Sequence, residues 1–298
     1  MTDTALPLIV AWQGLALRLP PGWEVAGTYG NWKSGHLLLA RERLPVLRVS
    51  WERRRETPHL ERTLAKAAKR VAHETGCLAL PGHEGAGPDG GVVRCQGRMS
   101  EIAVGARRFA EAGVTVIWRQ LAPSPVAELT AMVRASAAVG EDAPADWRIH
   151  GLACTLPPWW RNEAVQALAG LTRAVWFRHP PGRRGADQVL VLRRMACAGR
   201  VLAGRDLETW LRTTLHKNES ATAETNADGV RLSCSRPAAN WLRRLRGRVD
   251  VRQFHAWIDE PEDRVTVQEW AGGGEPLGCL RQGPSPQGSR LFNGRSSA

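Results

Sequence analysis

The sequence has none of the motifs from which an enzymatic activity is usually inferred. It contains no GxSxG nucleophile elbow, no Walker loop, no HExxH helix and no GxGxxG that opens a strand-to-helix unit. Gly272-Gly273-Gly274 follows the last apolar run, where such a triplet is typical of a flexible linker. We therefore assign no catalytic residue and no cofactor, although a site drawn from distant residues between two domains remains open.

The cysteines and histidines form no metal-binding pattern. The six cysteines are scattered singly without a CxxC pair, and Cys95 and Cys234, which lie in similar apolar runs, are expected to be small buried side chains. His73, Cys77 and His83 match no standard zinc spacing, and His255 is interpreted as an ordinary strand residue. The acidic run 259–263 includes a proline and favours a hairpin turn. No metal site is expected.

A long hydrophobic run is also missing. No stretch approaches the roughly 20 apolar residues of a membrane span. The N-terminus lacks the basic start and apolar core of a signal peptide. A cytoplasmic location without a membrane span is the expectation.

Lysine is scarce, with four residues against 37 arginines, and the net charge is +12. Residues 1–146 carry +3 and residues 147–298 carry +9, so the basic character belongs mainly to the second part. Its densest points define a candidate partner surface: Arg243, Arg244, Arg246, Arg248, Trp241, Arg183 and Arg184. Such a surface suits an acidic protein face or nucleic acid phosphates, and a solvated loop without a partner is the other interpretation.

Tyrosine and phenylalanine are rare, with one and four residues, whereas there are 13 tryptophans. Trp23 and Trp160 follow the same Leu-Pro-Pro motif and are expected to pack in the core. Four other tryptophans lie near loops without a counterpart and are predicted to contribute to a contact surface, because tryptophan is enriched at interface hot spots. They are Trp12, Trp32, Trp159 and Trp241.

The chain contains an internal duplication. Residues 14–23 read GLALRLPPGW and residues 151–160 read GLACTLPPWW, an offset of 137. Three further matches keep the order while the offset drifts: 59–64 with 206–211, 93–95 with 232–234, and 114–116 with 265–267. Loops of different length explain such drift. The sequence therefore predicts one unit written twice, over 8–140 and 147–272, and a flexible tail over 273–298.

Short runs rich in valine and leucine predict six strands in each copy. In the first copy they are 15–19, 36–40, 46–51, 92–97, 107–112 and 114–120; in the second they are 152–156, 173–178, 188–196, 230–236, 253–259 and 264–270. Apolar spacing predicts a helix over 58–71, with Thr57 as cap, and a second one after Asp206. A third helix is expected over 126–139, without a counterpart in the second copy.

This order of elements, with an opening strand that ends in Leu-Pro-Pro-Gly-Trp at 19–23, resembles the PsbP/DcrB-like family. The resemblance implies an α+β fold of two tandem copies, each an antiparallel sheet packed with helices. It also implies a role in binding other proteins. The missing terminal helix of the second copy departs from the family pattern and leaves one face of its sheet for the first copy or for a partner.

The leading hypothesis is a non-enzymatic adaptor or accessory subunit of a bacterial protein assembly. The alternative is a nucleic-acid-binding protein that uses the basic second copy, with exposed tryptophans as a stacking platform. The third is an enzyme with a site between the copies.

Overall fold

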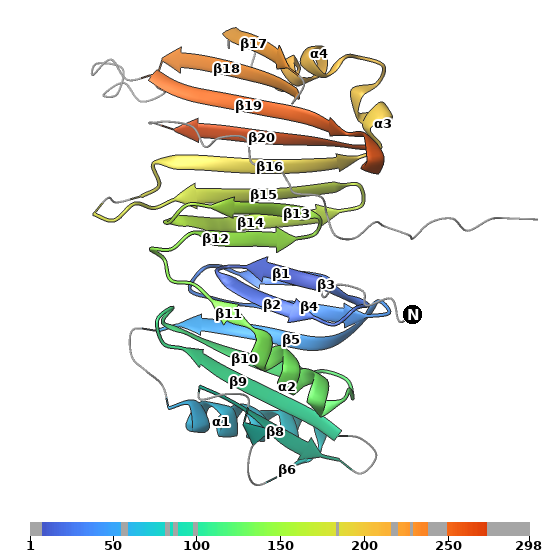
Figure 1. The fold of residues 1–298 in the computed structure, drawn as a ribbon, viewed down its shortest axis with the longest axis vertical. Coiled ribbons are helices and arrows are strands. Elements are labelled where there is room, and N and C mark those ends of the chain that lie inside the picture. Colours follow the sequence, from blue (N-terminus) through green and yellow to red (C-terminus); the bar gives the residue numbers. More distant parts are fainter. Residues whose placement is uncertain are drawn as a thin grey trace, which may run out of the picture.

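The computed structural model describes residues 8–54, 59–80, 84–85, 89–97, 101–182, 185–215, 220–226, 229–237 and 249–272. Within these ranges the chain forms twenty strands, four α-helices and one 3-10 turn. The strands make two large antiparallel sheets at the two ends of the molecule and a smaller sheet between them (Figure 1). We refer to residues 8–138 as the first half and to residues 145–272 as the second half.

The two large sheets have the same strand order. In the first half the order is β3 (Trp23–Gly30), β4 (Ser34–Arg41), β5 (Leu44–Arg53), β10 (Val114–Gln120), β9 (Glu101–Phe109), β8 (Gly90–Gln96) and β6 (Leu78–Ala79), and β7 (Glu84–Gly85) also pairs with β8. In the second half the order is β14 (Trp160–Leu168), β15 (Leu171–Arg178), β16 (Gln188–Ala196), β20 (Arg264–Gly272), β19 (Val249–Asp259), β18 (Gly229–Pro237) and β17 (Ser220–Asn226).

The hairpins β9–β10 and β19–β20 fix which residues correspond in the two halves. Their last paired residues are Phe109 with Val114 and Asp259 with Arg264, so the structural offset is 150. The sequence match of 114–116 with 265–267 is therefore wrong by one residue. Such a slip reverses the face on which every side chain lies. Val114 and Val116 accordingly pack in a different core cluster from Val265 and Val267.

The small central sheet joins the two halves about a local two-fold axis. Its order is β11 (Ala137–Ala138), β2 (Leu15–Leu19), β1 (Leu8–Trp12), β12 (Ala145–Ile149) and β13 (Leu152–Leu156). β1 pairs with β12 at Ala11 and Arg148, which are 137 positions apart. Because 137 is also the offset of the repeated motif, equivalent residues face each other across the junction, as they do in a symmetric dimer.

Both central hairpins turn through a dipeptide with positive φ. Gln13 and Gly14 have φ of 53° and 73°, and His150 and Gly151 have φ of 48° and 77°. Positive φ at both central residues is the geometry of a type I′ turn, whose twist matches that of the paired strands. This explains why glycine stands at the same place in each copy of the motif.

The main hydrophobic core runs through both halves. It contains leucines of β2 and β13 together with inward-facing residues of both large sheets. Trp147 lies between Trp12 and Trp176, with ring centroids 5.6 and 5.8 Å away in edge-to-face contacts. The two halves share this core, because the central hairpins bury their leucines and tryptophans against both large sheets.

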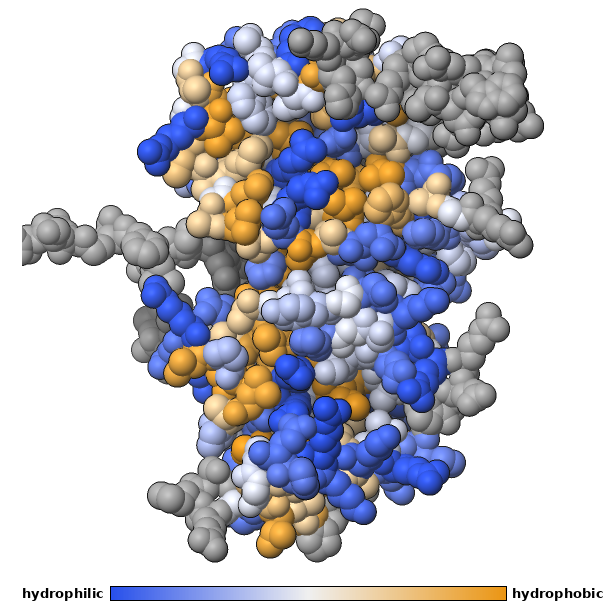
Figure 2. Space-filling model, turned by 180° about the vertical axis from the view of Figure 1, so that it is seen from behind, coloured by the Kyte–Doolittle hydropathy of each residue, from blue (hydrophilic) through white to orange (hydrophobic). Residues whose placement is uncertain are grey.

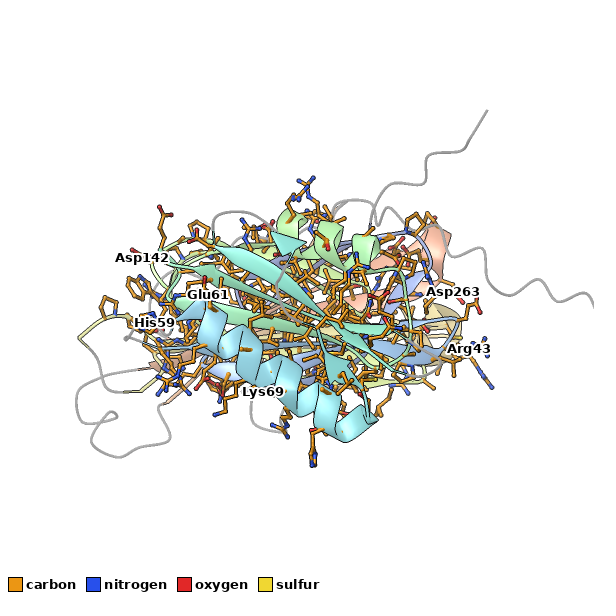
Figure 3. All side chains as sticks on the ribbon, turned by 90° about the horizontal axis from the view of Figure 1, so that it is seen from below. Arg43, His59, Glu61, Lys69, Asp142 and Asp263 are labelled. Atoms are coloured by element: carbon orange, nitrogen blue, oxygen red, sulfur yellow. The ribbon has the colours of Figure 1, made fainter. Side chains whose placement is uncertain are left out.

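We call the side of each large sheet that faces the central sheet its inner face, and the opposite side its outer face. In the first half α1 (Leu60–Thr75) covers the outer face and α2 (Val126–Ala135) the inner face. Figure 3 shows the two helices on opposite sides of the sheet, with His59, Glu61 and Lys69 on the α1 side. In the second half the outer face carries α3 (Ala198–Leu202) and α4 (Leu207–Arg212).

The local helix predictions are largely confirmed. Asp206 caps α4, accepting a hydrogen bond from the Thr209 amide at 2.8 Å. α1 begins at Leu60, and Thr57 and Pro58 lie outside the described residues. α2 begins at Val126 as predicted, but it ends at Ala135 because residues 137 and 138 pair with β2. The predicted turn at 259–263 contains the 3-10 turn Glu260–Glu262.

The prediction of an α+β fold, with two sheets packed by helices, is wrong. The described chain is dominated by three antiparallel sheets and carries short helices on limited parts of them. The prediction failed because it missed the edge strands β3, β14 and β17 and the partner strands β1 and β12 of the central sheet. β3 and β14 bury few residues beyond their first tryptophans, so they lack the continuous apolar run by which buried strands are recognised.

Candidate functional site

The seven residues of the predicted basic surface all lie outside the described residues. They are Arg183, Arg184, Trp241, Arg243, Arg244, Arg246 and Arg248. The basic surface therefore stays a prediction.

Two of the predicted contact tryptophans are core residues instead. Trp12 and Trp32 retain 2% and 4% of their surface. Arg53 lies 3.9 Å above the Trp32 ring and donates a hydrogen bond to the Trp32 carbonyl at 2.8 Å. Burial lowers the pKa of Arg53 to about 10, which leaves it charged at neutral pH. Trp23 and Trp160, each 3% exposed, are core residues as predicted.

The outer face of the second sheet is only partly covered. α3 and α4 pack over residues of β16, β18, β19 and β20, including Met195, Leu232, Phe254 and Val267. None of the residues in this cluster comes from β14 or β15. The described helices therefore leave the outer face of β14, β15 and the adjoining part of β16 uncovered.

An arginine pair lies on this uncovered surface. Arg173 of β15 and Arg193 of β16 are direct cross-strand partners, and both are partly exposed. Like charges that stand directly opposite each other on a sheet are destabilising. The pair therefore needs an explanation other than stability.

Apolar side chains flank the arginine pair on both sides. Two residues further along β15, Val175 lies opposite Val191, and these two side chains are only 8% and 7% exposed. Beyond them the partly exposed Phe177 lies opposite the partly exposed Val189. On the other side of the pair Leu171 lies opposite Met195, and Leu168 of β14 is 57% exposed. Figure 2, which views the molecule from behind, shows hydrophilic side chains between hydrophobic ones in the upper half of the molecule. We call this surface, from Leu168 to Val189 across β14, β15 and β16, the arginine face.

One carboxylate serves two arginines at the border of this face. Glu269 of β20 is 12% exposed and makes ion pairs of 2.7 Å with both Arg193 and Arg252. Arg252 also lies 4.9 Å above the Phe254 ring. Within the described residues Arg173 makes no ion pair, so its positive charge has no opposite charge at contact distance.

The first half provides an internal comparison for the arginine pair. The row His36, Ser50, Ile117 and Ala106 in the first sheet corresponds to the row Arg173, Arg193, Val267 and Ala256 in the second. The last two members of the row lie beneath helices and are similar in both halves. The uncovered members differ, because a histidine and a serine stand where the second half has two arginines.

The equivalent surface of the first half is nearly uncharged at this row. His36 stacks on Tyr29 with ring centroids 4.7 Å apart. Burial and the nearby charge of Arg48 lower the pKa of His36, which favours its neutral form at neutral pH. The fold is therefore compatible with a row that carries no pair of like charges, and the arginine pair is a feature of the second half.

The inner face of the second sheet carries the histidine singled out from the sequence. His255 of β19 is 6% exposed, and its Nδ1 atom has no hydrogen-bond partner. Burial and the charge of its cross-strand partner Arg231 lower its pKa. Trp257 lies against the ring, with centroids 5.1 Å apart. Within the described part of the chain, no hydrogen bond or ion pair joins His255 to a nucleophile or a carboxylate.

The structure offers no metal centre in the part of the chain that it describes. No group of three or more histidine, cysteine, aspartate or glutamate side chains there could hold an ion. Cys95 and Cys234 lie on equivalent strands and are both buried, as predicted for small core residues. Burial, with a contribution from Asp146, raises the pKa of Cys154 to about 12, which leaves that thiol unreactive.

Comparison with known proteins gives little guidance. No family model matches the chain, and no curated protein matches it. Among solved structures it is similar to the apo structure of the immunity protein TplEi of the T6SS from Pseudomonas aeruginosa. The match has 11% sequence identity, covers 95% of this chain and 93% of that chain, and has a TM-score of 0.28. A score this low does not establish a shared fold. None of these comparisons tests the PsbP/DcrB-like resemblance, which stays a prediction.

None of the described helices is long and apolar enough to cross a membrane. The cytoplasmic location stays a prediction.

Sequence reasoning missed the arginine face. Arg173 and Arg193 are 20 positions apart, and neither belongs to a basic cluster as dense as 243–248. Their proximity depends on the register of β15 and β16, which the sequence does not reveal. The alternation of Arg173, Val175 and Phe177 with Ala174 and Trp176 was the available signal, because successive strand residues point to opposite faces.

Proposed function

We propose that the chain is a non-enzymatic adaptor or accessory subunit that binds another protein through the arginine face. The observation that carries the proposal is the combination of paired arginines and flanking apolar side chains on a sheet surface that the described helices leave uncovered. Arginine, methionine and aromatic residues such as phenylalanine are enriched at protein interfaces, and arginine is also enriched at their hot spots.

The duplication supports the same conclusion. Two copies of one fold share a strand order and a core, yet this surface differs between them at its exposed positions. A difference at exposed residues adds nothing to the core. The second half therefore supplies the contact surface, and the first half and the central sheet support it rigidly.

Co-purification from the native host tests this function. The tagged chain is compared with a Phe177→Thr/Val189→Thr variant, which removes apolar contact area from the arginine face while keeping residues that suit strands. We expect a stoichiometric protein partner that survives nuclease treatment with the original chain and is lost with the variant.

A Leu38→Thr variant is the matched control. Leu38 is a partly exposed residue on the outer face of β4 in the first half, and its replacement should leave the partner bound. Retention of the partner by the double variant, or loss of every partner on nuclease treatment, would contradict the proposal. The second outcome would instead support a nucleic-acid-binding role.

A further inference from the structure

We infer that the partner reaches the arginine face with a carboxylate placed between apolar side chains, and that Arg173 is its main contact. This inference rests on the proposed function and names the chemistry of the partner. It starts from the charge balance of the face, on which Glu269 is shared by Arg193 and Arg252 while Arg173 has no ion pair among the described residues.

The arginine pair is costly for the isolated chain. Arg173 and Arg193 face each other directly, and their repulsion is only partly relieved by Glu269, which contacts Arg193. A carboxylate brought by a partner would remove this repulsion. The arginine guanidinium presents a planar set of donors that matches a carboxylate in a two-point contact, and this contact is stronger than a neutral hydrogen bond.

The apolar side chains of the arginine face indicate which residues surround the carboxylate in the partner. Along β15, Leu171, Arg173 and Val175 point to the same face at every second residue. A strand rises about 3.3 Å per residue, so the partly exposed Leu171 lies about 7 Å from the arginine on one side. Val175 is 8% exposed, and the partly exposed Phe177 lies about 13 Å from the arginine on the other side. A matching partner segment carries an acidic side chain with apolar side chains at about these distances.

The first half suggests a residue that can replace Arg173 and remove its positive charge. Its equivalent of Arg173 is His36, which the same strand position accommodates. The test variant is therefore Arg173→His, measured at pH 7.5. The control is Arg148→His, an equal change of charge at an exposed residue of the central sheet.

The probe is the partner protein that co-purifies with the original chain, isolated from that complex, and its affinity is measured by calorimetry. For Arg173→His we expect binding weakened by about tenfold or more, the loss of about one charge-assisted contact. We also expect a Tm that is unchanged or about 1–3 °C higher, because the like-charge pair is gone. Arg148→His should change neither quantity.

Three other results would contradict the inference, and they differ in what they imply for the proposed function. If Arg173→His binds as tightly as the original chain while Phe177→Thr/Val189→Thr does not bind, the carboxylate inference is wrong and the proposed function stands. If Arg173→His lowers the Tm by several degrees, Arg173 has a structural role and the inference is wrong. If the original chain has no partner, the proposed function fails and the inference fails with it.

Discussion

Replacing Trp147 by alanine should lower the free energy of unfolding by about 3–5 kcal/mol, the usual cost of removing a buried large aromatic side chain. Trp147 is 1% exposed and belongs to β12, a strand of the central sheet. Its ring contacts Trp12 from the first half and Trp176 from the second. The cavity left by alanine would lie where the two halves meet.

The number of unfolding transitions shows whether the two halves unfold together. Because the main core runs through both halves, strand content by circular dichroism and tryptophan fluorescence should report one transition in guanidinium chloride. The alanine variant should shift that single transition as a whole. Trp147→Phe keeps an aromatic ring at the junction and should cost less than half as much.

Two well-separated transitions for the original chain would show that the halves fold independently. A cost below about 1 kcal/mol for Trp147→Ala would equally contradict a shared core, because surface substitutions have effects of that size.

Replacing Arg194 by methionine should cost about 2–3 kcal/mol, somewhat less than breaking a fully buried ion pair. The Arg194 side chain is 4% exposed and donates a hydrogen bond to Glu262 at 2.6 Å and another to the carbonyl of Gly151. A further oxygen, from Asp259, lies 3.5 Å away. Arg194 thus ties the turn of the β12–β13 hairpin to the turn between β19 and β20.

The size of the expected effect follows from what methionine leaves behind. It fills much of the same volume but cannot donate hydrogen bonds, so the Gly151 carbonyl loses a donor. Glu262 and Asp259 keep 24% and 34% of their side-chain surface, and contact with water reduces the penalty. Burial also lowers the pKa of Arg194, so part of the ion-pair energy already offsets the loss of hydration.

Arg264→Met is the matched control for this site. Arg264 makes a longer contact of 3.5 Å with the same Glu262 and is 31% exposed, so its loss should cost under about 1 kcal/mol. Denaturant melts of both variants give the two values. Equal costs for Arg194→Met and Arg264→Met would contradict the assigned role of Arg194.

The duplication and several local elements could be predicted from the sequence, since they depend on residues close together in the chain. Leu-Pro-Pro followed by tryptophan marks the same turn in both halves, and Asp206 caps its helix. Edge strands were harder. β14 reads WRNEAVQAL, whose alanines and leucine suit a helix as well as a strand, and most of its residues are exposed.

Features that depend on strand register could not be predicted. Val114 and Val265 match as letters, yet the turns of the two hairpins have the same length, so Val114 corresponds to Arg264. The arginine face has the same origin, because pairing between β15 and β16 brings Arg173 to Arg193. β1 pairs with β12 and so joins the two halves, but nothing in the two sequence segments indicates that they are partners.

Photo-crosslinking in the native host can show directly whether a protein partner binds the arginine face. p-Benzoylphenylalanine is placed at position 177 on the arginine face or at position 38 on the outer face of the first sheet, both of them partly exposed. We expect position 177 to crosslink to one protein in good yield and position 38 to give no such product. Equal crosslinking at the two positions, crosslinking at position 38 alone, or none at either position would contradict it.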